Sequence, residues 1–224
     1  PLVAYSGSLG QKVYFSLKDA ILSLAYQPGE ILRKGDICDA LGVSRSPVSE
    51  AMARLAADGL VEVVPQAGTF VLRFSIDEIR EGAFLREALE LAAIELVAEI
   101  ITEAEIVQLR RNLRVQEALV ADADFEGFYK LDSEMHEMLM SFTGHRRLAQ
   151  IAQTAWLHVD RARQLILPAP GRVEATLVEH RAIVDAVAAH DAALARQVTR
   201  HHLRQLMSYL EPLEREHPEL FSPS

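Results

Sequence analysis

The stretch LGVSRSPVSEAMARLAADGL, residues 41–60, decides how the chain is interpreted. It predicts a tight turn followed by a helix, because either Ser44 or Ser46 can cap that helix and Pro47 fits its first turn. Apolar residues then recur at spacings of four and three, which predicts one buried face formed by Val48, Met52 and Leu55. The exposed N-terminal end carries hydroxyl and basic side chains, where backbone N–H groups favour phosphate. This is the layout of the recognition helix in a helix-turn-helix.

Weaker patterns on either side of this stretch predict a winged helix-turn-helix. Residues 13–24 and 32–41 each carry an apolar stripe with helical spacing. After the recognition helix, residues 60–64 and 69–72 are rich in β-branched side chains and flank a turn at 65–68, which predicts a hairpin. Three helices and a hairpin are the parts of a winged helix-turn-helix domain.

Charge and histidine content divide the chain after Phe74. The net charge is −9, yet residues 1–74 hold seven basic and seven acidic side chains and are neutral. The negative excess and all eight histidines lie in residues 75–224. A neutral N-terminal part gives only weak support for DNA binding, so its basic side chains must be locally placed.

The composition predicts a soluble, cytoplasmic protein. The 224 residues are enough for two domains with separate cores. No apolar run is long enough to span a bilayer, no signal peptide is recognisable, and no membrane partner is expected. The single cysteine, Cys38, rules out an internal disulfide framework and is typical of a reducing compartment.

From Ser75 onward the patterns predict helices only. Thr102 and Glu105 form a capping box, and His190-Asp191 joins the last two helices so tightly that they should pair antiparallel. The tail from Glu211 is expected to be frayed. The expected helices are 76–99, 102–120, 124–142, 145–167, 173–189 and 191–210.

Four ionisable side chains in these helices point to a metal site. Asp132 and His136 are one turn apart on an otherwise apolar face, and His180 and His202 lie on the apolar stripes of the last two helices. His180 and His202 are about equally far from the helix junction, so antiparallel pairing places them at one height. Three imidazoles and a carboxylate suit Zn²⁺, Ni²⁺, Co²⁺ or Mn²⁺. One inward histidine is usually an ordinary core residue, and His201 competes with His202, so the hypothesis depends on the coincidence of all four.

Two sets of residues resemble a known protein family. Residues 13–71 resemble the GntR family of bacterial transcription regulators through Pro28-Gly29-Glu30-x-Leu32, Leu41-Gly42-Val43-Ser44-Arg45-x-Pro47-Val48-x-Glu50-Ala51, Leu55, Gly59-Leu60, Pro65, Gly68 and Val71. The second part resembles the all-helical effector domain of the FadR subgroup, called FCD, through Leu85-Arg86-x-x-x-Glu90, Asp132-x-x-x-His136, Glu179-His180-x-x-Ile183, Asp191, Ala195 and His202-Leu203.

The resemblance implies a homodimer that binds a palindromic operator and responds to a small, often carboxylate-bearing metabolite in a pocket floored by a metal. Residues 1–74 would be the winged helix-turn-helix DNA-binding domain, and residues 75–224 the all-helical domain for effector binding and dimerisation. His202 is favoured over His201 because Leu203 follows it. Arg86 matches an arginine that projects toward the pocket, where it could bind the effector or form a structural ion pair.

The expected DNA contacts come from the recognition helix, the wing and basic residues close to them. They are Ser44, Arg45, Ser46 and Ser49 at the major groove, Gln66, Gly68 and Thr69 at the wing tip, and Arg33, Lys34 and Arg54 nearby. Gly35 and Ser49 stand where the family usually has arginine. Since a bidentate base contact contributes ~1–3 kcal/mol, a divergent operator is expected.

Two other functions remain open at this point. Three histidines and an aspartate with open coordination positions can activate water, as in a metal-dependent hydrolase or lyase. No additional general base or nucleophile stands out beside the cluster, so we expect a regulator and no enzyme. Alternatively, the metal in a regulator is purely structural, in which case chelation would lower the melting temperature while no organic acid would change DNA affinity.

Overall fold

The computed structural model describes residues 2–148, 151, 156–166 and 169–222. The chain divides into two compact units, Pro1–Ile76 with Glu214–Ser224 and Asp77–Leu213. None of the helices in the described part combines the length and the apolar character that a membrane crossing requires.

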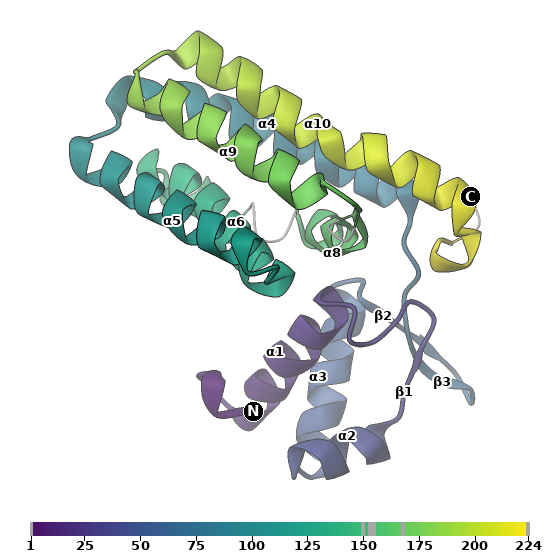
Figure 1. Cartoon of the computed structure of the whole chain (residues 1–224). Coiled ribbons are helices and arrows are strands. Elements are labelled where there is room, and N and C mark those ends of the chain that lie inside the picture. The colour runs from purple at the N-terminus through teal and green to yellow at the C-terminus, as the bar shows by residue number, and fades with distance from the viewer. Residues whose placement is uncertain (1, 149–150, 152–155, 167–168, 223–224) are drawn as a thin grey trace. The chain divides into compact units, whose positions relative to one another are not determined.

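The first unit contains the predicted three helices and hairpin, with one further strand (Figure 1). Strand β3 lies in the middle of an antiparallel sheet of order β1-β3-β2, with Val61 opposite Val71 and Ile31 opposite Phe70. The elements are η1 Leu2–Ala4, α1 Leu9–Leu22, β1 Ile31–Leu32, α2 Lys34–Leu41, α3 Arg45–Ala57, β2 Val61–Val64 and β3 Gly68–Val71.

The apolar face predicted for the recognition helix forms the centre of this unit. Val48 and Leu55 are fully buried and Met52 is 2% exposed. Helix α3 packs on α1, whose buried side chains include Val13, Leu17 and Ile21. Gly42 ends α2 with a φ of 64°, a left-handed conformation that glycine adopts without strain.

Two helix starts differ from the sequence prediction. The helix expected from Leu32 begins at Lys34, because Ile31 and Leu32 pair with β3 instead. Helix α1 starts at Leu9 rather than near Val13, since Ser8 and Gln11 form a capping box that the apolar pattern does not reveal.

The C-terminal tail is ordered and belongs to the first unit. Helix α10 continues through Pro212 to Glu216, and η2, Pro218–Leu220, follows. Phe74 then pairs with the tail: its N–H donates to the carbonyl of Leu220 at 3.0 Å and its carbonyl accepts from Ser222 at 2.8 Å. The prediction of a frayed tail was wrong, because it left out Phe221, which is buried.

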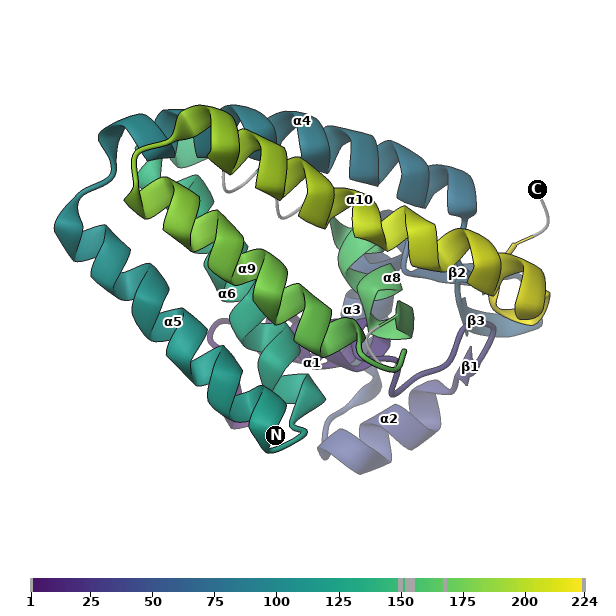
Figure 2. The same ribbon diagram turned by 45° about the horizontal axis from the view of Figure 1, so that its top comes forward.

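The second unit is a bundle of helices (Figures 1 and 2). Helices α4 and α10 lie side by side in both views, and ion pairs of Glu87 with Arg204 and Glu95 with Arg196 connect them. The helix expected over 145–167 includes residues outside the described ones. The helices are α4 Ile76–Ile100, α5 Glu103–Ala121, α6 Phe125–Phe142, α8 Leu157–Ile166, α9 Arg172–Ala188 and α10 Ala192–Glu216.

Capping residues and an apolar core fix the helices that carry the predicted metal ligands. The capping box of Thr102 with Glu105 is present at the start of α5. Asp124 caps α6 by accepting a hydrogen bond from the backbone N–H of Gly127 at 2.9 Å. The core combines side chains of α4, α5, α6 and α9, among them Val97, Leu109, Phe128, Met135, Leu139, Ile183 and Val187.

Candidate functional site

The four predicted metal ligands form one cluster inside the bundle. Asp132 and His136 come from α6, His180 from α9 and His202 from α10, and one ligand atom of each lies within 4.8 Å of the others. All four side chains are buried, whereas the competing His201 is exposed. The helical spacing therefore predicted this cluster correctly.

Two of the histidines are oriented by carboxylates, one from the buried Glu90 and one from the half-buried Glu179. Nδ1 of His136 lies 2.7 Å from Oε2 of Glu90, and Nδ1 of His202 lies 2.7 Å from Oε2 of Glu179. An ionised carboxylate only accepts hydrogen bonds, so each Nδ1 donates and each Nε2 is left to face the centre of the cluster. These two Nε2 atoms face each other at 3.2 Å. Two imidazole Nε2 atoms at this separation can both bind one divalent cation.

The third histidine and the aspartate follow the same pattern. Nδ1 of His180 donates to Oε1 of Gln116 at 2.8 Å, and the Gln116 amide is itself fixed because its Nε2 donates to Asn112 at 2.6 Å. Oδ2 of Asp132 pairs with Nη2 of Arg163, while Oδ1 lies 3.2 Å from Nε2 of His180. Each of the four side chains thus has one polar atom held from outside and another turned toward the centre.

The atoms turned toward the centre provide the test of whether a metal fits. Oδ1 of Asp132 and Nε2 of His180 are buried and have no hydrogen-bond partner among the described residues. Leaving such groups unpaired in a protein interior is costly. Three imidazole nitrogens and one carboxylate oxygen are ligands that zinc, nickel, cobalt and manganese accept, so the residues present fit a divalent ion of this kind.

The protonation states agree with this fit. Burial, and then the nearby His136, holds the pKa of His180 well below its usual value; burial and the nearby His180 do the same for His202. Burial alone would raise the pKa of Glu90, but Arg86 and His136 outweigh it and set that pKa at about 2. At neutral pH, His180 and His202 are therefore neutral and Glu90 is ionised.

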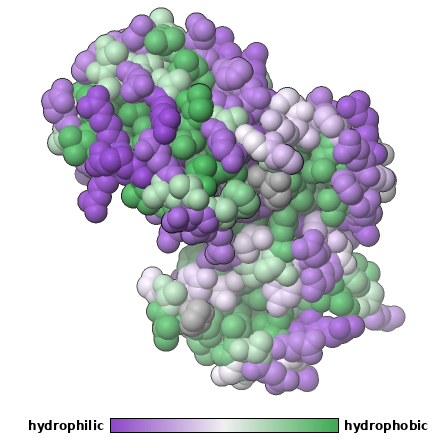
Figure 3. Space-filling view, in the orientation of Figure 1, coloured by the Kyte–Doolittle hydropathy of each residue, from purple (hydrophilic) through white to green (hydrophobic). Residues whose placement is uncertain are grey.

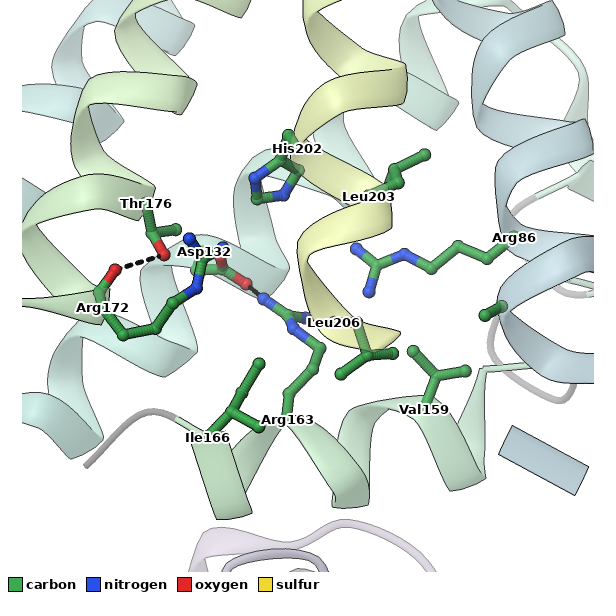
Figure 4. A pocket seen from close by; sticks show the side chains of 11 residues that line it. Arg86, Asp132, Val159, Arg163, Ile166, Arg172, Thr176, His202, Leu203 and Leu206 are labelled. Carbon is green, nitrogen blue, oxygen red and sulfur yellow. Dashed lines mark hydrogen bonds and ion pairs between the residues drawn. The ribbon is translucent and has the colours of Figure 1, made fainter. Parts of the chain in front are cut away.

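A small pocket adjoins the cluster (Figure 4). Its volume of about 30 Å³ corresponds to about one water molecule. Three arginines approach it from different helices: Arg86 from α4, Arg163 from α8 and Arg172 from α9. The other lining residues are Ala83, Asp132, Val159, Ile166, Thr176, His202, Leu203 and Leu206.

Arg86 combines the two roles that the sequence left open. Its Nε donates to Oε1 of Glu90 at 2.5 Å, and its guanidinium lies 5.1 Å from the centre of the Trp156 ring. The structural ion pair therefore exists, and the same side chain lines the pocket. Its contact with an effector stays a prediction.

Sequence reasoning missed the residues that hold the ligands from outside. Glu90 and Glu179 were noted only as members of the family pattern, and Gln116, Arg163 and Arg172 were not singled out. A usable signal existed for Glu90, because it lies one turn after Arg86 on a buried face. For Gln116, on another helix, the sequence contains no comparable signal.

The predicted wing residues and the basic residues near them line one groove in the first unit. Arg33, Lys34, Gln66, Gly68 and Thr69 surround a volume of about 470 Å³. The side chain of Thr69 is buried and Gly68 is half-buried, which leaves Arg33, Lys34 and Gln66 as the exposed members. This groove combines basic side chains with a β-turn, as expected of a wing that follows a phosphate backbone.

The recognition-helix residues lie at the start of α3. Ser44, Arg45 and Ser46 are exposed and Ser49 is half-buried, so the N-terminal end of this helix is accessible to a partner. Arg54 lies near the other end, where its guanidinium is 4.0 Å from the centre of the Tyr14 ring. That stacking orients Arg54 within the first unit.

Both parts of the chain match described protein families. Residues 9–71 match the bacterial regulatory proteins of the gntR family, and residues 81–205 match the FCD domain. An uncharacterized HTH-type transcriptional regulator in an unstable DNA locus of Streptomyces ambofaciens is 36% identical over 210 residues, which cover 94% of this chain and 88% of the relative. The HTH-type transcriptional repressor RspR of Escherichia coli K12 is 28% identical over 214 residues, covering 96% and 94%.

Solved structures share the fold. Escherichia coli McbR/YncC superimposes with a TM-score of 0.81 at 21% identity, covering 93% of this chain and 99% of that one. A putative transcriptional regulator GntR from Rhodococcus sp. RHA1 has a TM-score of 0.78 at 26% identity, covering 90% and 97%. The combination of a winged helix-turn-helix with an all-α bundle is therefore an established architecture.

Proposed function

We propose that this chain, which belongs to the GntR family of bacterial regulatory proteins and carries an FCD domain, binds operator DNA as a homodimer and responds to a small carboxylate metabolite at a metal-centred pocket. Residues 1–74 are the DNA-binding domain in this proposal. Residues 75–224 bind the effector and form the dimer. The site of action is the cytoplasm.

The ligand cluster is the observation that carries the proposal. Asp132, His136, His180 and His202 turn one polar atom each toward a common centre, and oxygen or nitrogen atoms of the surrounding residues fix the other. A divalent ion bound there supplies a Lewis acid with open positions for a carboxylate oxygen. Zinc, nickel, cobalt and manganese all meet the requirements of this donor set.

The pocket beside the cluster supports an anionic effector. Three of its six polar lining residues are arginines, whose planar guanidinium groups match a carboxylate with two parallel hydrogen bonds. Arg86 is the residue that we expect to take part in binding the effector. Its ion pair with Glu90, which holds His136, provides a link from that effector to a metal ligand.

DNA binding is assigned to the first unit. Arg45 and the neighbouring Ser44, Ser46 and Ser49 would enter the major groove, and the groove formed by the wing would lie along the backbone. A two-fold symmetric dimer presents two such heads to a palindromic operator. Effector binding would shift the dimer between two arrangements. In one, the distance between the two DNA-binding domains matches the operator half-sites, and in the other it does not.

Exposed apolar side chains of the second unit support dimer formation. Figure 3 shows hydrophilic side chains interspersed with apolar ones over the visible face. Among the described residues Phe84 on α4 is 73% exposed, and Leu85 beside it is 40% exposed. A second copy of the chain that covers this part of α4 would remove both from water.

An electrophoretic shift assay tests the proposal. The zinc-loaded protein is titrated onto the DNA upstream of its own gene at low salt, with and without a panel of small organic acids. We expect a shifted band that an acid changes for the wild-type protein, no shift for Arg45→Ala, and a shift that no acid changes for Asp132→Asn. Absence of any shift at low salt would count against the proposed function.

A melting-temperature measurement and a turnover assay, beside the shift assay, separate the two remaining functions. If the metal is purely structural, chelation lowers the melting temperature and no acid in the panel changes the shift. The relatives described above are transcription regulators, so turnover of an ester or a sugar acid by the zinc-loaded protein would be needed to revive an enzymatic function.

A further inference from the structure

Asp160 on α8 places a carboxylate between two arginines of the pocket. Its Oδ1 lies 3.4 Å from Nη1 of Arg163 and 4.0 Å from Nη1 of Arg86. The side chain of Asp160 is 30% exposed, whereas those of Arg86 and Arg163 are 5% and 11% exposed. Two buried guanidinium groups from different helices thus reach one partly buried carboxylate.

The guanidinium of Arg163 connects this position to the metal cluster. Its Nη2 pairs with Oδ2 of Asp132 while its Nη1 faces Asp160, so one planar group separates the two carboxylates (Figure 4 shows the pair with Asp132). Arg163 therefore faces the metal cluster with one nitrogen and the position of Asp160 with the other.

The charge balance favours a ligand with two negative charges. A divalent ion, the three pocket arginines and the four carboxylates that pair with them leave one net positive charge. If the Asp160 side chain leaves, two positive charges remain, which a dianion neutralises and a monoanion does not. The carboxylates counted are those of Glu90, Asp132, Asp160 and Glu179.

We propose that the effector is a short dicarboxylate and that Asp160 occupies the place of its second carboxylate. One acid group would bind at the metal, and the other would replace Asp160 between Arg86 and Arg163. This inference rests on the metal-centred pocket of the proposed function. The present cavity of about 30 Å³ holds no such acid, so the side chains that line it must also move apart when the acid binds.

Asp160 is poorly stabilised where it lies. Burial raises its pKa to about 6, which outweighs the opposing effect of Arg86. A ligand carboxylate that forms two parallel hydrogen bonds with an arginine would be the better partner, because Asp160 makes only one bond to Arg163 and a 4.0 Å contact with Arg86.

Calorimetric titration of the full-length, zinc-loaded chain tests the inference. The probes are malonate, succinate and malate, with acetate, butyrate and lactate as their single-acid counterparts. We expect at least one diacid to bind about tenfold more tightly than its counterpart. Asp160→Asn, which removes the competing charge, should raise the diacid affinity about tenfold again and leave the affinity for the single acids unchanged. Arg163→Lys should reduce the diacid preference, because lysine cannot form the paired bonds.

Asp185→Asn is the matched control, because Asp185 is exposed on α9 and, unlike Asp160, is not paired with Arg86 or Arg163. Equal affinities for diacids and single acids, or a diacid affinity that Asp160→Asn leaves unchanged, would overturn the inference. Zinc content and DNA binding are measured on the same samples. Loss of the diacid preference alone refutes only this inference, whereas a chain that binds neither zinc nor DNA refutes the proposed function as well.

Discussion

The two units bury different kinds of side chain. Among the described residues up to Ile76, Thr69 is the one buried polar side chain, and the rest of that core is apolar. Between Asp77 and Leu213 fourteen described polar or charged side chains are buried, including Arg86, Glu90 and Asp132. A charge in the interior is costly unless it is paired, so the second core depends on ion pairs and hydrogen bonds much more than the first does.

The first core depends only on apolar packing, while the second depends on what occupies its centre. Stability of the second unit should therefore respond to metal and to pH, and stability of the first to neither. The following predictions test that difference.

Removal of a metal ligand should have the largest effect. Zinc at about a thousand times its dissociation constant stabilises a folded protein by about 4 kcal/mol, and His180→Ala should abolish this stabilisation. Calorimetry of the wild-type and variant proteins, each with zinc and with a chelator, measures it. A zinc-dependent stabilisation that survives in His180→Ala would show that the ion binds elsewhere.

Truncation of an apolar side chain in the first core should lower the free energy of unfolding slightly less than removal of a metal ligand does. This loss should not depend on zinc. Leu55 is fully buried in α3, and Leu55→Ala is expected to destabilise its unit by about 3 kcal/mol through the cavity it creates. Denaturation with urea, with and without zinc, provides the comparison. A loss of unfolding free energy that changes with zinc would contradict the independence of the first unit from the metal.

When a chelator has removed the metal, acid should destabilise the second unit. His180 and His202 stay neutral in the fold because their pKa values are lowered, whereas the unfolded chain binds protons near pH 6.5, so stability present above that pH is lost as the pH falls below it. Asp160, with its pKa raised to about 6, works in the opposite direction. The net loss between pH 7.5 and 5.5 should be about 2 kcal/mol.

The first core supplies the contrast for this pH experiment. The described part of the first unit contains one histidine, His217, which is exposed, so unfolding of that unit should vary little over the same pH range. Urea titrations at several pH values, followed by the fluorescence of Trp156 for the second unit and by circular dichroism for the whole chain, distinguish the two. A second unit with flat stability from pH 7.5 to 5.5 would contradict the neutral-histidine arrangement.

A substitution of Glu90, which holds a metal ligand from outside the cluster, should have the smallest effect on the free energy of zinc binding. Glu90→Gln removes the charge that holds Nδ1 of His136 and should lower zinc affinity about tenfold, or about 1.4 kcal/mol. Glu95→Gln, on the same helix and paired with Arg196 at the surface, is the control and should leave zinc affinity unchanged. Competition with a coloured chelator measures both. Equal zinc affinities for the two variants would refute the positioning role of Glu90.

Helical spacing was enough to predict the inner side chains of the site. Asp132 and His136 are neighbours on one helix, and the short His190-Asp191 junction sets the relative height of His180 and His202. In the first unit the same reasoning predicted the buried Val48, Met52 and Leu55 face. Each of these predictions needed only the spacing of residues within one helix, together with, for His180 and His202, the short junction between two helices.

The features that the sequence did not predict depend on contacts between distant segments. Gln116 holds His180 across 64 positions, and Phe221 joins Phe74 across the length of the second unit. Ile31 and Leu32 form a strand only because β3 is present to pair with them. No spacing rule within a single helix or strand reveals such pairs.

X-ray absorption at the zinc edge of the stoichiometrically loaded full-length protein tests the central claim most directly. The account predicts one zinc per chain, bound only by nitrogen and oxygen at about 2.0–2.2 Å, with the signature of three imidazoles. In Asp132→Asn the imidazoles should remain while the affinity falls. A zinc ion with fewer than two imidazoles, or a purified chain that binds no stoichiometric zinc, would contradict the account.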